Sequence, residues 1–220
     1  VILAMCGAGL RVGAQHSQML HPLLTAIPGL KVVMPSNAYD AKGLLLTAMR
    51  DDDPVIFLEH KLLFDTASEV PDGDYFIPFG EAAFPREGTD VTVVALSGMV
   101  PKAIAVADRL AKDGVSVEVI DPRTTSPLDE DSILESVEKT GRLVVVDEDN
   151  PRCGMASEIA SLAVGKAFDC LKAPVQKVTP PHTPTPSTPE LEKEYIPDAA
   201  RVEAAVRRVL AAGVPIAKAG

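Results

Sequence analysis

Short runs rich in valine and isoleucine alternate with helix-length segments along the whole chain. In the first third, this pattern predicts buried strands at residues 1–5, 32–34 and 55–58. A helix is expected to start at residues 36–40, where Asn37 can cap it, and to run through residues 44–49. Strands that alternate with helices are typical of α/β proteins built on parallel sheets.

Residues 66–90 interrupt the alternation with a polar connection that is rich in proline and glycine. One short strand is expected inside it, at residues 75–77. Connections this long without regular periodicity are uncommon within a compact domain, so a domain boundary is predicted here. We expect a first domain at residues 1–75, a linker at 76–90 and a second domain at 91–213.

The strand and helix rhythm restarts after residue 90. Strands are predicted at residues 91–96, 115–120, 143–147 and 175–178, and helices at residues 100–112, 129–139, 154–171 and 199–211. Residues 180–186 hold four prolines and can form neither a regular helix nor a central strand. The fold class is therefore α/β, with two parallel-sheet domains.

Composition and charge exclude several classes of protein. The net charge of −10 argues against a nucleic-acid-binding module, which needs clustered Lys and Arg. No apolar run approaches the length of about 20 residues that a membrane span requires. The three cysteines are widely spaced and indicate reduced thiols in a cytoplasmic protein. Because Val1 stands inside a predicted strand and no signal sequence precedes it, a fragment of a longer chain is expected.

Three glycines, Gly7, Gly9 and Gly13, follow the first predicted strand and suggest a dinucleotide-binding turn. Such a site needs a helix that opens within the glycines and an acidic residue about 20 positions later. The second strand instead ends at Met34-Pro35-Ser36, without a carboxylate. The sequence therefore argues against a nicotinamide or flavin site.

Directly after these glycines, Gln15-His16-Ser17-Gln18 places a titratable imidazole among hydrogen-bonding neighbours. An imidazole exchanges protons near neutral pH, so His16 is a candidate proton carrier, although a single histidine is more often structural. The other histidines, His21, His60 and His182, are expected to be structural or solvated.

Two acidic runs stand at ends of predicted elements. The first, Asp51-Asp52-Asp53, is expected to be a solvated turn, and a cation site is the alternative. The second, Asp147-Glu148-Asp149-Asn150, follows a strand at the carboxyl end, where open α/β sheets bind ligands. A subunit contact or a helix cap would explain the second run equally well.

Several longer segments together resemble the β subunit of the thiamine-diphosphate-dependent component of 2-oxoacid dehydrogenase complexes. The resemblance runs from residue 1 to about residue 210, and its most specific parts are residues 14–18, 27–33, 39–45, 50–61, 121–129 and 190–193. Residues 121–127, 147–153 and 181–184 are most similar to the acetoin dehydrogenase branch of this family.

This resemblance implies a fold, a cofactor and partners. The fold would be a truncated pyrimidine-binding domain followed by a transketolase-type carboxy-terminal domain. An α₂β₂ heterotetramer would hold thiamine diphosphate between subunits, with the α subunit contacting the diphosphate and magnesium. His16 would face the route by which a lipoyl-bearing acyltransferase delivers lipoyl, and would exchange a proton during acyl transfer.

Departures from the family pattern limit what this chain can do alone. The family's glutamate that activates the aminopyrimidine, and the aromatic residues that stack on it, would precede Val1. A potassium site of the family would use residues 48–53, with Ala48, Asp51 and Asp53 as candidate ligands, and one further ligand would also precede Val1. We therefore expect the 220-residue chain by itself to be inactive and to bind thiamine diphosphate poorly.

Two other functions remain open. The same chemistry could act on pyruvate or on branched-chain 2-oxo acids, because few residues decide the substrate. The chain could also be a non-catalytic module that pairs subunits and docks the acyltransferase, because residues 91–210 carry no obvious catalytic constellation.

Overall fold

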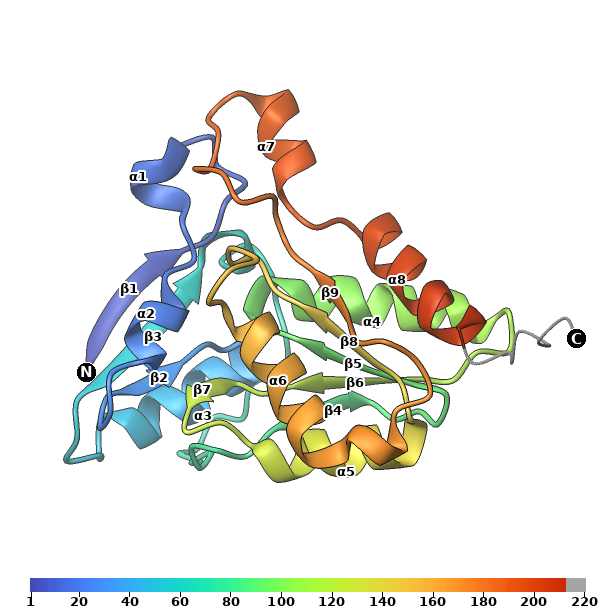
Figure 1. Cartoon of the computed structure of the whole chain (residues 1–220). Coiled ribbons are helices and arrows are strands. Elements are labelled where there is room, and N and C mark those ends of the chain that lie inside the picture. Colours follow the sequence, from blue (N-terminus) through green and yellow to red (C-terminus); the bar gives the residue numbers. More distant parts are fainter. Residues whose placement is uncertain (213–220) are drawn as a thin grey trace, which may run out of the picture.

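The computed structural model describes residues 1–212, which form two sheets that lie side by side (Figure 1). The first sheet has the order β1-β3-β2-β7, with β1 at Ile2–Cys6, β3 at Val55–His60, β2 at Lys31–Val33 and β7 at Thr124–Ser126. Its first three strands are parallel, and β7 runs antiparallel to β2.

The second sheet has the order β4-β6-β5-β8-β9. Its strands are Ala83–Arg86 (β4), Val117–Asp121 (β6), Val91–Ala95 (β5), Leu143–Val146 (β8) and Gln176–Val178 (β9). Only the edge strand β4 is antiparallel to its neighbour. The predicted α/β class with two mainly parallel sheets is confirmed, and each sheet also carries an antiparallel edge strand.

Helices cover both faces of the second sheet. On one face, α4 (Val100–Ala111) and α8 (Ala199–Ala211) pack onto the valines of β5, β6 and β8. On the other face, α5 (Glu130–Thr140) and α6 (Met155–Ala167) bury a separate cluster with Ile120 and Leu143. Two layers of helix thus exclude water from the central strands, which explains their continuous apolar sequences.

Shorter helices cover the first sheet. Its two faces are packed by α2 (His21–Thr25) and by α3 (Ala38–Ala48), respectively. The Asn37 side chain accepts a hydrogen bond from the Asp40 amide at 2.9 Å, so the expected helix start is a true N-cap. The remaining helix before β2 is α1 (Gly13–Ser17), and a 3₁₀ turn, Lys61–Leu63, follows β3.

The predicted connection at residues 66–90 differs from the structure in one respect. Residues 75–77 form no strand: Ile77 is buried against α3, and its amide donates to the Gly43 carbonyl. The strand in this region is β4, which pairs with β6 although it contains Pro85. An edge strand tolerates proline because one of its sides makes no ladder hydrogen bonds.

The carboxy-terminal part contains a helix that was not predicted from the sequence, α7 (Pro189–Tyr195). The predicted helix at residues 154–171 ends as α6 at Ala167, and a 3₁₀ turn, Phe168–Cys170, continues it. The helix at 199–211 is confirmed as α8. The expected end of the second domain, residue 213, lies outside the described residues.

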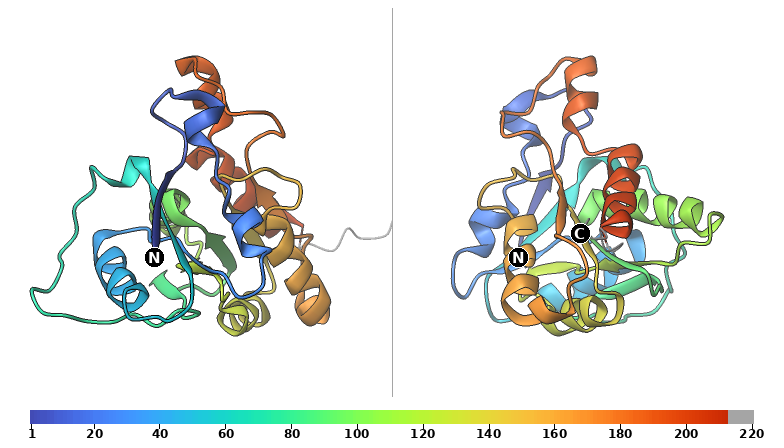
Figure 2. Two further views of the ribbon diagram at one scale, coloured as in Figure 1. Left: turned by 90° about the vertical axis from the view of Figure 1, so that its left-hand side faces the viewer. Right: turned by 45° about the vertical axis from the view of Figure 1, so that its right-hand side comes forward.

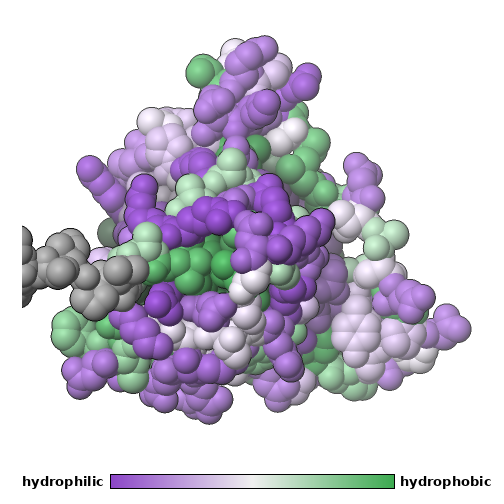
Figure 3. Space-filling view, turned by 90° about the vertical axis from the view of Figure 1, so that its right-hand side faces the viewer, coloured by the Kyte–Doolittle hydropathy of each residue, from purple (hydrophilic) through white to green (hydrophobic). Residues whose placement is uncertain are grey.

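Two further views show how the parts meet. Helix α7 lies beside α1, far in sequence but close in space, at the end of the molecule opposite α5 (Figures 1 and 2). The side on which α8 ends is largely hydrophilic, with one band of hydrophobic side chains (Figure 3). None of the helices formed by residues 1–212 is long and apolar enough to cross a membrane.

Candidate functional site

The proton-carrier candidate His16 lies on α1, a five-residue helix that starts as the chain leaves the glycine-rich turn after β1. Ser17 and Met19 are buried and attach this segment to the sheet, whereas His16 is exposed. His16 lines a hollow of about 640 Å³. Four apolar and four polar residues form this lining: Met5, Val12, Ala14, Leu20, Gln15, His16, Gln18 and Lys61.

One polar contact attaches α1 to the turn after β3, and a second lies within the α1 segment. The Lys61 ammonium donates to the His16 carbonyl, and the Gln18 side-chain amide donates to the Ala14 carbonyl at 3.0 Å. No hydrogen bond from the described residues engages the His16 ring nitrogens. His16 therefore stays a candidate for proton exchange in this hollow.

The glycine-rich turn itself is held by carboxylates from the second half of the chain. The Ala8 amide donates to Glu148 at 2.6 Å, and the Gly9 and Arg11 amides donate to Glu192 at 2.9 and 3.1 Å. Backbone amides of such a turn often bind phosphate, but these three already bind carboxylates. This arrangement gives a physical reason for rejecting a dinucleotide site at this turn.

His60 is buried at the end of β3, in a slot between two glycines. A Cβ added at Gly7 or at Gly98 would come within 2.3 or 2.7 Å of its ring. Its Nδ1 accepts from the Leu62 amide at 3.3 Å, so Nε2 carries the proton and donates to Glu148 at 3.0 Å. His60 is structural, as expected, and it orients the carboxylate that holds Ala8.

His21 is fully buried and binds Asp147 at 3.0 Å between Nε2 and Oδ2. Burial alone would lower the pKa of His21, but the charge and hydrogen bond of Asp147, with Asp149 and Glu148 nearby, raise it. Burial and the neighbouring Asp147 raise the pKa of Asp149 to about 6. The structure gives the acidic run at residues 147–150 a role that the sequence did not suggest, a contact within the chain that joins α2 of the first sheet to the end of β8.

The ligand atoms of His21, Asp147 and Asp149 lie within 4.8 Å of one another, which is close enough to hold a metal ion. Within this cluster, His21 and Asp147 bind each other directly. The sequence did not indicate this cluster, because His21 and Asp147 are 126 positions apart.

The candidate potassium ligands are occupied by a cation of the chain itself. Both oxygens of Asp51 lie 2.6–2.7 Å from the Lys31 ammonium, and Asp53 lies 3.1 Å from it. The Ala48 carbonyl accepts the Asp51 amide at 3.3 Å. Asp51 and Asp53 are thus paired with Lys31, and the potassium site stays a prediction.

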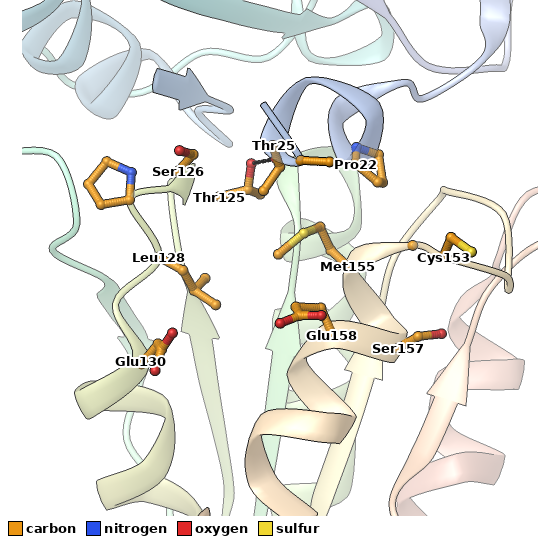
Figure 4. Close-up of a pocket in the computed structure, with 13 residues that line it drawn as sticks. Pro22, Thr25, Thr125, Ser126, Leu128, Glu130, Cys153, Met155, Ser157 and Glu158 are labelled. Atoms are coloured by element: carbon orange, nitrogen blue, oxygen red, sulfur yellow. Dashed lines mark hydrogen bonds between the residues drawn. The ribbon is translucent and has the colours of Figure 1, made fainter. Parts of the chain in front are cut away.

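Another hollow, of about 570 Å³, lies between α2, the segment from β7 to α5, and the start of α6 (Figure 4). The hydroxyls of Thr25 and Thr125 bond to each other at 2.6 Å on its wall. Its titratable lining within residues 1–212 consists of Cys153, Glu130 and Glu158. Since it offers no imidazole, the hollow beside His16 is the better candidate for proton transfer.

Comparison with known proteins gives two matches to family models. Residues 80–202 match the transketolase C-terminal domain, and residues 1–66 match the transketolase pyrimidine-binding domain. The chain belongs to the family of the transketolase C-terminal domain. Strands β1, β2 and β3 of the first sheet lie in the part that matches the pyrimidine-binding domain. Strand β7 lies in the part that matches the C-terminal domain and pairs with β2.

The chain is also similar to individual proteins that are named as subunits of an oxidoreductase or a dehydrogenase. The chain is 57% identical to the acetoin:2,6-dichlorophenolindophenol oxidoreductase subunit beta of Cupriavidus necator, over 97% of this chain and 63% of that protein. It is 47% identical to the pyruvate dehydrogenase E1 component subunit beta of Rickettsia felis, over 92% and 62%. The chain thus spans about three fifths of the length of these relatives.

Among solved structures, a split gene transketolase described as an inactive β4 tetramer matches with a TM-score of 0.79 and 26% identity. The match covers 97% of this chain and 67% of that chain. The transketolase-like family implies thiamine diphosphate as cofactor. The hollow beside His16 matches only part of a thiamine diphosphate site. Its lining within residues 1–212 holds no carboxylate that would bind the aminopyrimidine.

Proposed function

We propose that the chain is part of the β subunit of a thiamine-diphosphate-dependent dehydrogenase that cleaves acetoin and passes the acyl unit to lipoyl. The observation that carries this proposal is the 57% identity to an acetoin oxidoreductase β subunit along almost the whole chain. The lower identity of 47% to a pyruvate dehydrogenase β subunit favours acetoin over pyruvate.

In this proposal the chain contributes a proton carrier and one wall of the reaction space. Thiamine diphosphate, when bound, supplies the electron sink for cleavage next to a carbonyl. His16 exchanges a proton at an imidazole nitrogen with the oxygen or sulfur of the reacting groups, and Met5 and Leu20 form apolar parts of the wall. An activating carboxylate has to come from outside the described residues.

Partners belong to the same proposal. An α subunit would complete an α₂β₂ heterotetramer and contact the diphosphate and magnesium, and a lipoyl-bearing acyltransferase would accept the acyl unit. The relative from C. necator is itself named as a β subunit, which supports a multi-subunit enzyme. A cytoplasmic location agrees with three cysteines that form no disulfide within residues 1–212.

A substrate comparison tests the proposal. The β subunit would be assembled with its α subunit and assayed with acetoin, pyruvate and 2-oxoisovalerate separately, with lipoyl-bearing acyltransferase as acceptor. We expect kcat/KM for acetoin to exceed the other two by at least about tenfold, since a pocket distinguishes small apolar groups by factors of about 10–200. The 220-residue chain alone, as a control, is expected to give no turnover.

Higher kcat/KM for pyruvate or 2-oxoisovalerate would replace acetoin with that substrate. Absence of turnover with all three in an assembled, cofactor-loaded enzyme would contradict the catalytic proposal. It would favour the non-catalytic module that pairs subunits and docks the acyltransferase.

A further inference from the structure

The buried carboxylate of Glu192 on α7 holds the turn that carries the proton carrier. We propose that Glu192 is a positioning residue for His16, and that the transketolase-type C-terminal domain thereby sets the geometry of the reaction space. This inference rests on the proposed function. Glu192 is 4% exposed, and its hydrogen bonds come from the Gly9 and Arg11 amides, more than 180 positions earlier in the chain.

A buried carboxylate is unfavourable unless its charge is compensated. Within the described residues, no Lys or Arg forms an ion pair with Glu192, so these backbone amides provide the compensation. Hydrogen bonds from N–H groups to a carboxylate are charge-assisted and stronger than neutral ones. The contact therefore stabilises one particular shape of the turn.

That shape is one the turn would not keep easily without the carboxylate. Gly9 has φ of 115° and Arg11 has φ of 62°, and the latter is an uncommon conformation for a residue with a side chain. The turn leads into α1, which has five residues and no side-chain N-cap. Helices this short do not persist on their own, so the turn fixes the start of α1, while the buried Ser17 and the Lys61 contact fix its end.

A second carboxylate, Glu148, supports the same turn through the Ala8 amide at 2.6 Å. It also accepts from His60, so a substitution there would disturb β3 as well. Among the described residues, the Glu192 carboxylate accepts only from this turn, so it is the cleaner position for a test. Helices α1 and α7 stand beside each other at one end of the molecule (Figures 1 and 2).

The test combines Glu192→Gln with a matched control on the same helix. Gln keeps the size of the side chain but removes its charge, whereas Glu194→Gln makes the same change at an exposed position. In the assembled enzyme, hydrogen exchange of a peptide covering residues 7–17 reports the turn directly. We expect Glu192→Gln to speed this exchange about tenfold, because the turn loses about as much stability as one charge-assisted hydrogen bond provides. Glu194→Gln should leave the exchange unchanged.

Turnover then shows whether the turn acts through His16. Glu192→Gln is expected to lower kcat for acetoin about tenfold, with KM within about twofold, because the imidazole is misplaced during the reaction. In a His16→Ala background the same substitution should lower kcat no further, and Glu192→Asp, which keeps the charge, should recover part of the loss.

Different outcomes separate this inference from the proposed function. Unchanged exchange in Glu192→Gln, or an equal fall in kcat with and without His16, would overturn the positioning role. Full turnover in His16→Ala alone would instead overturn the role of His16 as proton carrier, and absence of acetoin turnover in the wild-type assembled enzyme would overturn the proposed function. Hydrogen exchange would still decide in that case whether Glu192 holds the turn.

Discussion

The two sheets of this chain differ in how completely their strands are covered. In the second sheet, every residue of β5 and β8 is buried between two layers of helix. In the first sheet, β1 is an edge strand on which only Cys6 is buried, and Ile2, Leu3 and Met5 are 55–66% exposed. One sheet is enclosed by its own chain, whereas the other presents apolar residues at its edge.

The difference indicates a division of roles. Function concentrates on elements that a rigid scaffold positions. The second sheet is such a scaffold, and the part of the chain after residue 90 that builds it also supplies β7, Glu148 and Glu192, which bind β2 and the turn after β1. The first sheet carries His16 and the hollow. Stability should therefore depend mostly on the second sheet, and activity on the first.

The largest expected effect on stability contrasts one leucine from each sheet. Leu143→Ala empties a fully buried site on β8 and is expected to lower the free energy of unfolding by about 3 kcal/mol. Leu3→Ala removes a side chain that is 55% exposed and should cost about 0.5 kcal/mol or less. Denaturant unfolding of the 220-residue chain measures both.

Equal losses of unfolding free energy in Leu143→Ala and Leu3→Ala would contradict the difference between the two sheets. A loss of about 2 kcal/mol or more for Leu3→Ala would mean that another surface covers β1 in solution. Repeating the measurement over a range of protein concentrations would then distinguish a second copy of the chain from a contact within it.

A smaller effect concerns the junction between the sheets, where Ser36 donates to the buried Asp121. Burial raises the pKa of Asp121 to about 7, although the Ser36 hydrogen bond opposes this shift. Between about pH 4 and 7 the folded chain keeps a proton that the unfolded chain has lost, so stability falls as the pH rises. From pH 5 to 8 this group should account for a loss of about 2 kcal/mol.

Asp121→Asn removes the titrating group and should flatten this part of the pH profile. Asp52→Asn changes an exposed aspartate in the same way and serves as the control. The measurement is the free energy of unfolding at pH 5, 6, 7 and 8 for the three proteins. If the free energy of unfolding of Asp121→Asn kept the wild-type dependence on pH, groups other than Asp121 would be responsible for that dependence.

Local sequence patterns predicted most of the scaffold but little of the junction. Val-rich runs such as that of β8 identify buried strands because two-sided burial requires continuous apolar residues. Asp198 caps α8, and the pattern located this helix fully. By contrast, β4 contains Pro85 and forms through pairing with a distant strand. Helix α7 did carry a signal, since Pro189 at its first turn is followed by acidic residues.

The candidate site could be predicted only in part from the sequence. His16 emerged from its neighbours and from a family resemblance, and the structure adds that it is exposed beside a hollow. The contact between Glu192 and Gly9 spans 183 positions, so no local spacing could reveal it. For the candidate potassium ligands, spacing likewise did not reveal that Lys31 binds Asp51 and Asp53.

The most direct test of the central claim is the turnover of acetoin by the assembled enzyme carrying His16→Ala. Loss of a general acid–base group predicts a fall in kcat of about 100-fold or more. His182→Ala, which removes an exposed histidine from the proline-rich loop, should leave kcat unchanged. Wild-type kcat in His16→Ala would contradict the account, because the first sheet would then not supply the proton carrier.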